Sequence, residues 1–202
     1  MVEGLDMLTW DEFAIVYLLP EAAAQYQLDL WSKVEAAFHL MGEPRPKSPP
    51  HITLKYPFAA VDLAAVETML AGFVDAVPPA PMALRGYNRF ITPDNYVIFL
   101  DVIPSSAARA VHAGLLKRLK DLSWMTWGQY DTADMHFHVT IAEKGQSGAA
   151  FGDLWAFVNS QPAPDFALHL DHLALVKIGK NDVPYRTFQT ASADPADRSL
   201  GL

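Results

Sequence analysis

The sequence of 202 residues contains no cysteine, no long uncharged hydrophobic run and no dense cluster of lysine and arginine. Without cysteine the chain can form no disulfide framework, use no thiol nucleophile and hold no cysteine-ligated zinc, and it fits a reducing compartment. The N-terminal residues lack the basic start and apolar run of a secretory signal, and no stretch is long and apolar enough to cross a bilayer. We therefore expect a cytoplasmic protein with no membrane partner.

Positive charge is also scarce, because 15 Lys and Arg residues stand against 23 Asp and Glu residues, for a formal net charge of −8. A long nucleic-acid duplex is held largely through its phosphates, so we do not expect such a duplex as a partner. A small phosphorylated molecule or one end of an RNA is compatible with this charge. Since 51% of the residues are hydrophobic, we expect one globular, monomeric unit over residues 1–190 and a flexible tail over 191–202.

The order of predicted elements repeats once along the chain. The first half is predicted to run strand, helix, strand, helix, strand at 14–20, 21–40, 49–58, 62–77 and 81–91. The second half is predicted to repeat this order at 96–104, 105–122, 135–144, 148–161 and 166–178. A weaker last strand is predicted at 184–191. The repeat indicates a duplicated architecture.

A His-x-Thr triplet with apolar neighbours occurs in the third element of each half. The first begins "HITL" at His51, and the second begins "HVTI" at His138. Side chains alternate between the two faces of a strand, so His51 and Thr53 share one face, as do His138 and Thr140. This composition rarely produces two such triplets at matched positions, which makes them the strongest functional signal in the chain.

Two facing histidines can perform chemistry that one cannot. Near neutral pH one imidazole can accept a proton while the other donates one, as in-line attack at phosphorus requires. The hydroxyls of Thr53 and Thr140 can donate hydrogen bonds to the non-bridging phosphate oxygens as charge develops there. The pattern therefore indicates a phosphoryl group as the target.

The paired motifs resemble those of the two-histidine (2H) phosphoesterase superfamily, and "PPHITLKYPF" (49–58) resembles its bacterial 2'-5' RNA ligase-like branch. The resemblance extends from about residue 13 to about residue 190. It implies an α+β fold of two pseudo-symmetric lobes, each a small antiparallel sheet with helices outside, and an active cleft between the sheets. We place the lobes at approximately 13–91 and 96–190, with the last strand a candidate to cross between them.

The resemblance also implies opening of a 2',3'-cyclic phosphate to a 2'-phosphomonoester, on an RNA 3' end or a cyclic nucleotide, without a metal or another cofactor. His51 would act as the acid and His138 as the base, and Thr53 and Thr140 would bind the phosphate. The reverse reaction would join RNA through a 2'-5' bond. Other candidate substrates are 2'-5' linked oligonucleotides and a cyclic phosphate derived from ADP-ribose. The alternative from another class is a nucleotide-binding module without turnover.

Several side chains outside the triplets are candidates for substrate binding. Lys55 and Lys144 continue the two rows by alternation and could neutralise phosphate charge, or could simply be solvated at the strand ends. Tyr185 and Arg186 belong to the predicted last strand, and arginine is suited to phosphate binding.

An aromatic segment, 124–131, directly precedes the second triplet. Trp127 and Tyr130 could stack on a nucleobase, as in proteins that bind single strands. Alternatively, these aromatic rings could cover the edge of the core.

His136 shares a predicted face with His138 and is a further candidate for substrate binding. "HFHVTIAE" (136–143) also carries the His-x-His and downstream Glu of a cupin metal motif, and two imidazoles at this spacing can share a metal. Three features disfavour a metal: Glu143 falls on the opposite face of a regular strand, a second cupin motif is missing, and long helices separate the strands.

Overall fold

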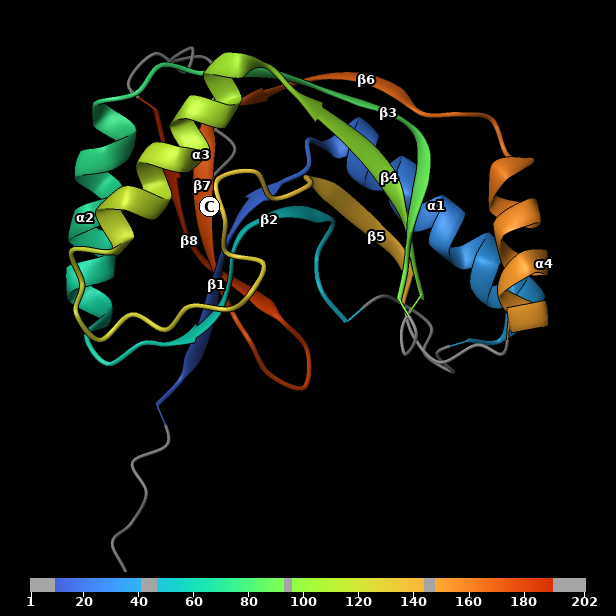
Figure 1. Cartoon of the computed structure of the whole chain (residues 1–202), viewed down its shortest axis with the longest axis horizontal. Coiled ribbons are helices and arrows are strands. Elements are labelled where there is room, and N and C mark those ends of the chain that lie inside the picture. The colour runs from blue at the N-terminus through green and yellow to red at the C-terminus, as the bar shows by residue number, and fades with distance from the viewer. Residues whose placement is uncertain (1–9, 41–46, 93–95, 144–147, 191–202) are drawn as a thin grey trace, which may run out of the picture.

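The computed structural model describes residues 10–40, 47–92, 96–143 and 148–190 (Figure 1). Its elements, in chain order, are β1 Glu12–Leu18, α1 Glu21–Phe38, β2 His51–Ala59, α2 Leu63–Asp75, β3 Ala80–Ile91, β4 Tyr96–Pro104, α3 Ser106–Leu119, β5 His138–Glu143, α4 Gly148–Asn159, β6 Asp165–Leu170, β7 His172–Lys177 and β8 Val183–Gln189. The predicted tail over 191–202 and Lys144 lie outside the described residues.

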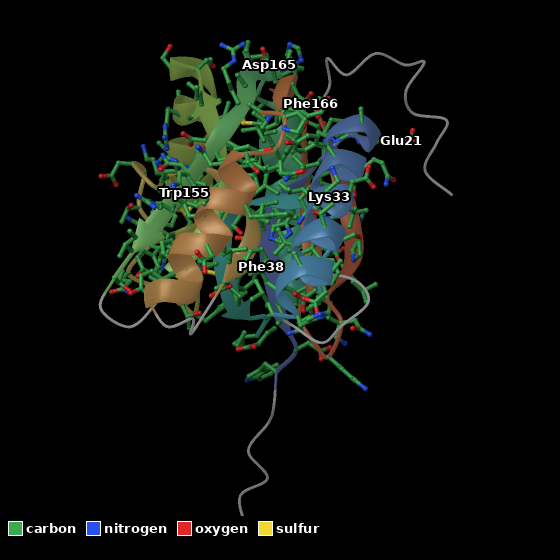
Figure 2. All side chains as sticks on the ribbon, turned by 90° about the vertical axis from the view of Figure 1, so that its right-hand side faces the viewer. Glu21, Lys33, Phe38, Trp155, Asp165 and Phe166 are labelled. Carbon is green, nitrogen blue, oxygen red and sulfur yellow. The ribbon has the colours of Figure 1, made fainter. Side chains whose placement is uncertain are left out.

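The strands form two antiparallel sheets. Sheet A has the order β2-β1-β7-β8, and sheet B has the order β5-β4-β3-β6. Helices α2 and α3 lie together on the side of β7 and β8, and α1 and α4 lie together on the side of β5 (Figure 1). Figure 2 faces this second side and shows α1, which carries Lys33 and Phe38, next to α4, which carries Trp155. The predicted α+β class, with two antiparallel sheets and helices outside them, is confirmed.

The sheets do not follow the two sequence halves, so the predicted lobes over 13–91 and 96–190 are wrong for two strands. Strand β3 of the first half pairs with β4 and β6 in sheet B, and β7 of the second half pairs with β1 in sheet A. The single strand predicted at 166–178 is divided at Asp171, where the chain passes from β6 in sheet B to β7 in sheet A. Strand β8 also lies in sheet A, next to β7.

One apolar cluster joins both sheets and the helices that cover them. Strands β1, β2, β3 and β4 supply five of its almost fully buried aliphatic side chains, Ile15, Leu54, Leu84, Ile98 and Leu100. Each of these side chains removes apolar surface from water, and its burial stabilises the fold by about 1.5–3 kcal/mol. No helix within the described ranges is long and apolar enough to span a membrane.

Candidate active site

The two His-x-Thr triplets begin β2 and β5, the strands along which the two sheets meet. His51 is the first residue of β2, and His138 is the first residue of β5. Both strands lie at an edge of their sheet, they contact each other, and they start side by side near the centre of Figure 1. The charge on His51 lowers the pKa of His138, which also indicates that the two rings are close.

The apolar residues of each triplet explain why the histidines and threonines face outward. Ile52 and Leu54 of β2 are fully buried, and Val139 and Ile141 of β5 are almost fully buried. The residues between them therefore lie on the opposite face, away from the core. Here His51, Thr53 and His138 are half-buried, and Thr140 is exposed. Sequence alternation predicted the shared faces of His51 with Thr53 and of His138 with Thr140 correctly.

Each triplet ends in an irregularity of the strand. In the pairing of β1 with β2, Val16 lies opposite Thr53 while Ile15 lies opposite Lys55, so Leu54 is an extra residue. In the pairing of β4 with β5, Phe99 lies opposite Thr140 while Ile98 lies opposite Ala142, so Ile141 is an extra residue. These are β-bulges at matched positions, and they extend the internal repeat to backbone geometry.

The bulge at Leu54 turns Lys55 away from the row, and the prediction that Lys55 binds substrate is wrong. Its side chain is fully buried, with Nζ 2.9 Å from Asp131 Oδ2, and the Asp131 side chain is fully buried too. The ammonium also donates to the Tyr56 carbonyl at 3.1 Å. An alternation argument assumes a regular strand, so it could not anticipate this reversal.

Backbone carbonyls hold both imidazoles in the same manner. His51 Nδ1 lies 2.6 Å from the Pro49 carbonyl oxygen, and His138 Nδ1 lies 2.9 Å from the His136 carbonyl oxygen. A carbonyl only accepts hydrogen bonds, so Nδ1 carries the proton and donates it in both rings. In a neutral ring, Nε2 then keeps its lone pair for proton transfer.

Burial lowers the pKa of both histidines from its ordinary value. For His51, the bond to the Pro49 carbonyl and the charge of Asp182 oppose this effect and raise the pKa. For His138, the bond to the His136 carbonyl and the charge of Asp101 raise the pKa, while the nearby His136 and His51 lower it further. Because each ring is largely desolvated, the neutral form is favoured in both.

The side chain of His136 is bound to a carboxylate beside His138. His136 Nε2 lies 2.7 Å from Asp101 Oδ1, and Asn88 Nδ2 donates to Asp101 Oδ2 at 3.3 Å. The Phe90 ring packs edge-on against both histidines, with centroids 5.5 Å from His136 and 5.2 Å from His138. Sequence reasoning missed Asn88, Phe90 and Asp101, since they come from β3 and β4 and belong to no motif.

Trp127 and Tyr130 contact other side chains near the end of β2 beyond the bulge. The Trp127 ring lies over the ammonium groups of Lys55 and Lys120, at 5.3 and 5.5 Å, and the Tyr130 ring packs against Tyr56 at 5.7 Å. Both side chains remain partly exposed, Trp127 at 37% and Tyr130 at 55%.

The predicted residues of the last strand also face away from the triplets. The Tyr185 ring contacts the core residue Phe13 at 5.3 Å, and Arg186 donates to the Glu67 carboxylate on α2. These contacts lie on the face of sheet A that α2 covers. A groove of about 700 Å³ lies between α2 and α3, and none of its lining residues belongs to a triplet.

Within the described part of the chain, no three His, Cys, Asp or Glu side chains gather in a way that could hold a metal ion. His136 and His138 instead bind a carboxylate and a carbonyl through Nε2 and Nδ1, respectively.

Comparison with known proteins finds one matching family model and several similar solved structures. The model of the 2'-5' RNA ligase superfamily matches residues 20–182, which include both triplets. No curated protein sequence matches the chain significantly. Among solved structures, the chain is similar to TT0787 of Thermus thermophilus, with 17% identity, a TM-score of 0.58, and 91% of this chain and 100% of that chain covered.

A second similar structure is that of LigT from E. coli complexed with 3'-AMP, with 12% identity and a TM-score of 0.58. The match covers 90% of this chain and 99% of that chain. At these identities the two structures show a shared fold, while the family model covers both catalytic candidates, His51 and His138.

Proposed function

The chain belongs to the 2'-5' RNA ligase superfamily, and we propose that it opens a 2',3'-cyclic phosphate to a 2'-phosphomonoester by acid and base catalysis between two histidines, without a metal. Membership in this superfamily supports phosphoesterase chemistry in general. One observation carries the specific proposal: the rings of His51 and His138 are oriented in the same way, each by a hydrogen bond from Nδ1 to the carbonyl of the residue two positions earlier. Matched orientation of two rings serves proton transfer at one shared group.

The proposed reaction begins with water beside the neutral ring of His138. Nε2 of His138 takes a proton as the water oxygen attacks phosphorus, and the bond between phosphorus and the 3'-oxygen breaks. Nε2 of the protonated His51 gives its proton to the departing 3'-oxygen, so the products are a 3'-hydroxyl and a 2'-phosphate. Each Nδ1–H bond to a carbonyl stabilises the imidazolium form of its ring and keeps Nε2 directed at the substrate.

The surrounding charges favour this division of roles. Asp182 raises the pKa of His51 and so favours the proton that a general acid needs. For His138, the charge of Asp101 raises the pKa, but the charges of His136 and His51 lower it by more and so favour the lone pair that a general base needs. In the reverse direction, which would form a 2'-5' bond between RNA ends, the two roles exchange.

Thr53 and Thr140 supply hydroxyl donors two residues beyond each histidine on the same face. Negative charge develops on the non-bridging phosphate oxygens in the transition state. A hydroxyl that donates a hydrogen bond to these oxygens therefore stabilises the transition state more than the ground state. The proposed substrate is a small cyclic nucleotide or an RNA 3' end. The nucleotide bound by LigT, 3'-AMP, supports a nucleotide ligand for this chain as well.

The test is incubation of the protein with 2',3'-cyclic AMP and with a short RNA that ends in a 2',3'-cyclic phosphate, each with and without EDTA. The proposal expects turnover that survives EDTA and yields only the 2'-phosphate, identified by phosphorus NMR. A bound nucleotide without turnover would instead support the nucleotide-binding module, and turnover abolished by EDTA would support the metal enzyme.

A further inference from the structure

The carboxylate of Asp182 lies outside both triplets and contacts the segment of chain that precedes His51. Asp182 lies in the turn between β7 and β8, and its backbone N–H donates to the Lys47 carbonyl at 3.1 Å. Its side chain accepts a hydrogen bond from Ser48 Oγ and lies 3.6 Å from Lys47 Nζ. Asp182 therefore holds Lys47 through its backbone and its side chain, and Ser48 through its side chain.

The turn itself fixes the direction of this carboxylate. The N–H of Gly179 donates to Asp182 Oδ1 at 3.1 Å, while Ser48 uses Oδ2. The Asp182 side chain is only 10% exposed, whereas that of Lys47 is 54% exposed. A carboxylate that is nearly buried and bound at both oxygens is held far more firmly than a surface ion pair.

The held segment leads directly to the carbonyl that orients His51. Pro49 and Pro50 follow Ser48, and neither has an N–H with which to anchor the backbone. The Pro49 carbonyl accepts from His51 Nδ1 at 2.6 Å, and the Pro50 carbonyl accepts from the Leu19 N–H at 3.0 Å. The bonds from Asp182 and the bond to Leu19 thus fix the two ends of this short proline segment.

The second triplet has a comparable arrangement made from different parts. The carbonyl of His136 orients His138, and the His136 ring is held by Asp101, which lies opposite His138 on β4. In both halves the orienting carbonyl belongs to a segment that a carboxylate from another strand or turn pins in place. The two carboxylates have no common position in the repeat, so the arrangement does not follow from the duplication alone.

We propose that Asp182 is a positioning residue for His51: it pins the segment Lys47–Pro50 so that the Pro49 carbonyl holds the imidazole in place for proton donation. The inference rests on the proposed function for the role of His51. Among the residues that the structure describes, the charged groups near this ring are Asp182, Lys47 next to it, and His138 across the two triplets. The anionic Asp182 favours the protonated ring, and Lys47 and a charged His138 oppose that effect.

The test compares Asp182→Asn and Asp182→Ala with Asp165→Asn and Asp165→Ala. Asp165 is a matched control because it forms an exposed ion pair with Arg85 at 2.8 Å. It lies on β6, at the edge of sheet B opposite β5. Asp182→Asn keeps a carbonyl oxygen for Ser48 or Gly179 and loses the charge, so it serves if the alanine variant folds poorly. NMR reports the tautomer and the pKa of His51, and steady-state kinetics with 2',3'-cyclic AMP report kcat and KM.

We expect Asp182→Asn to lower the pKa of His51 by about 0.5 or more. We expect Asp182→Ala to lower kcat about 10- to 100-fold with KM changed about twofold or less, because orientation is lost while phosphate binding remains. Neither Asp165 variant should do this. An unchanged pKa and tautomer of His51 in both Asp182 variants would overturn the inference, and so would a kcat for Asp182→Ala equal to that of Asp165→Ala. A wild-type protein without turnover would sink the proposed function, while the NMR result would still decide the role of Asp182.

Discussion

Lys55 and Asp131 form an ion pair whose side chains are both fully buried, with 2.9 Å between Nζ and Oδ2. The carboxylate also accepts the backbone N–H of Tyr56 at 2.9 Å and that of Gly128 at 2.7 Å. Asp131 therefore ties the loop that precedes β5 to the end of β2, directly after the first triplet. This pair is structural rather than substrate-binding.

Replacing Lys55 with Met should destabilise the fold strongly. The change leaves the Asp131 carboxylate buried without its counter-ion, and removing one partner of a buried pair costs about 3–5 kcal/mol in the free energy of unfolding. The control is Lys177→Met, because Lys177 pairs with Asp11 at 2.6 Å on the surface, with side chains 47% and 62% exposed. That change should cost about 1 kcal/mol or less. Chemical denaturation measures both values, and equal losses would contradict the structural role of the buried pair.

Loss of the hydroxyl of Thr53 or Thr140 should lower the catalytic rate and leave folding unaffected. Thr53→Val and Thr140→Val keep the branched shape and remove the hydroxyl, so we expect kcat for 2',3'-cyclic AMP to fall about 10- to 1000-fold, as for the loss of one oxyanion donor. Thr53→Ser and Thr140→Ser keep the hydroxyl and should retain most of the activity. The account fails for either position if its Val and Ser variants have the same kcat.

The dependence of kcat/KM on pH should be bell-shaped. The base His138 must be neutral, so activity falls as pH drops through its pKa, and the acid His51 must be protonated, so activity falls as pH rises through its pKa. Burial lowers the pKa of both rings, which places both limbs below the ordinary imidazole value of about 6.5. A rate that stays constant from neutral to strongly alkaline pH would contradict an imidazolium acid.

His112 on α3 supports the bulge of the first triplet from the core side. Its Nε2 lies 2.9 Å from the carbonyl oxygen of Leu54, the extra residue of the bulge, and its side chain is almost fully buried. His112→Ala should cost about 1–3 kcal/mol in the free energy of unfolding, because the buried carbonyl loses its donor. His112→Gln can restore a donor and should recover part of that loss.

Burial lowers the pKa of His112 as well, so the folded protein resists its protonation more than the unfolded chain does. The stability that this difference contributes is present above the unfolded value of about 6.5 and is lost as pH falls below it. Thermal unfolding at pH 7.5 and 5.5 checks the sign. A wild-type protein that is equally stable at both values, or more stable at pH 5.5, would contradict it.

The sequence predicted the features that depend on a local period. The alternation in "HITL" and "HVTI" placed His51, Thr53, His138 and Thr140 on outward faces, because Ile52 and Val139 must be buried. The alternation succeeds because burial acts on each strand residue separately. The repeated order of elements predicted only a duplicated architecture, and the α+β fold with two antiparallel sheets was implied by the resemblance of the paired motifs to the 2H phosphoesterase superfamily.

Features that depend on partners far along the chain could not be predicted in this way. The bulges at Leu54 and Ile141 have no turn residue or glycine to mark them, so Lys55 was placed on the wrong face. Asp131 and Asp182 act 76 and 134 residues from Lys55 and Ser48, respectively. The exchange of β3 and β7 between the sheets also leaves no periodic signal. On either side of Asp171, for example, apolar residues recur in the same way.

The most direct test of the two-histidine account is the rate of 2',3'-cyclic AMP hydrolysis by the wild type, His51→Ala and His138→Ala, with His39→Ala as a control for a histidine at the end of α1. The account predicts that each catalytic variant loses at least about 100-fold in kcat while keeping its fold, and that the control does not. Wild-type turnover that persists in either catalytic variant would contradict the account.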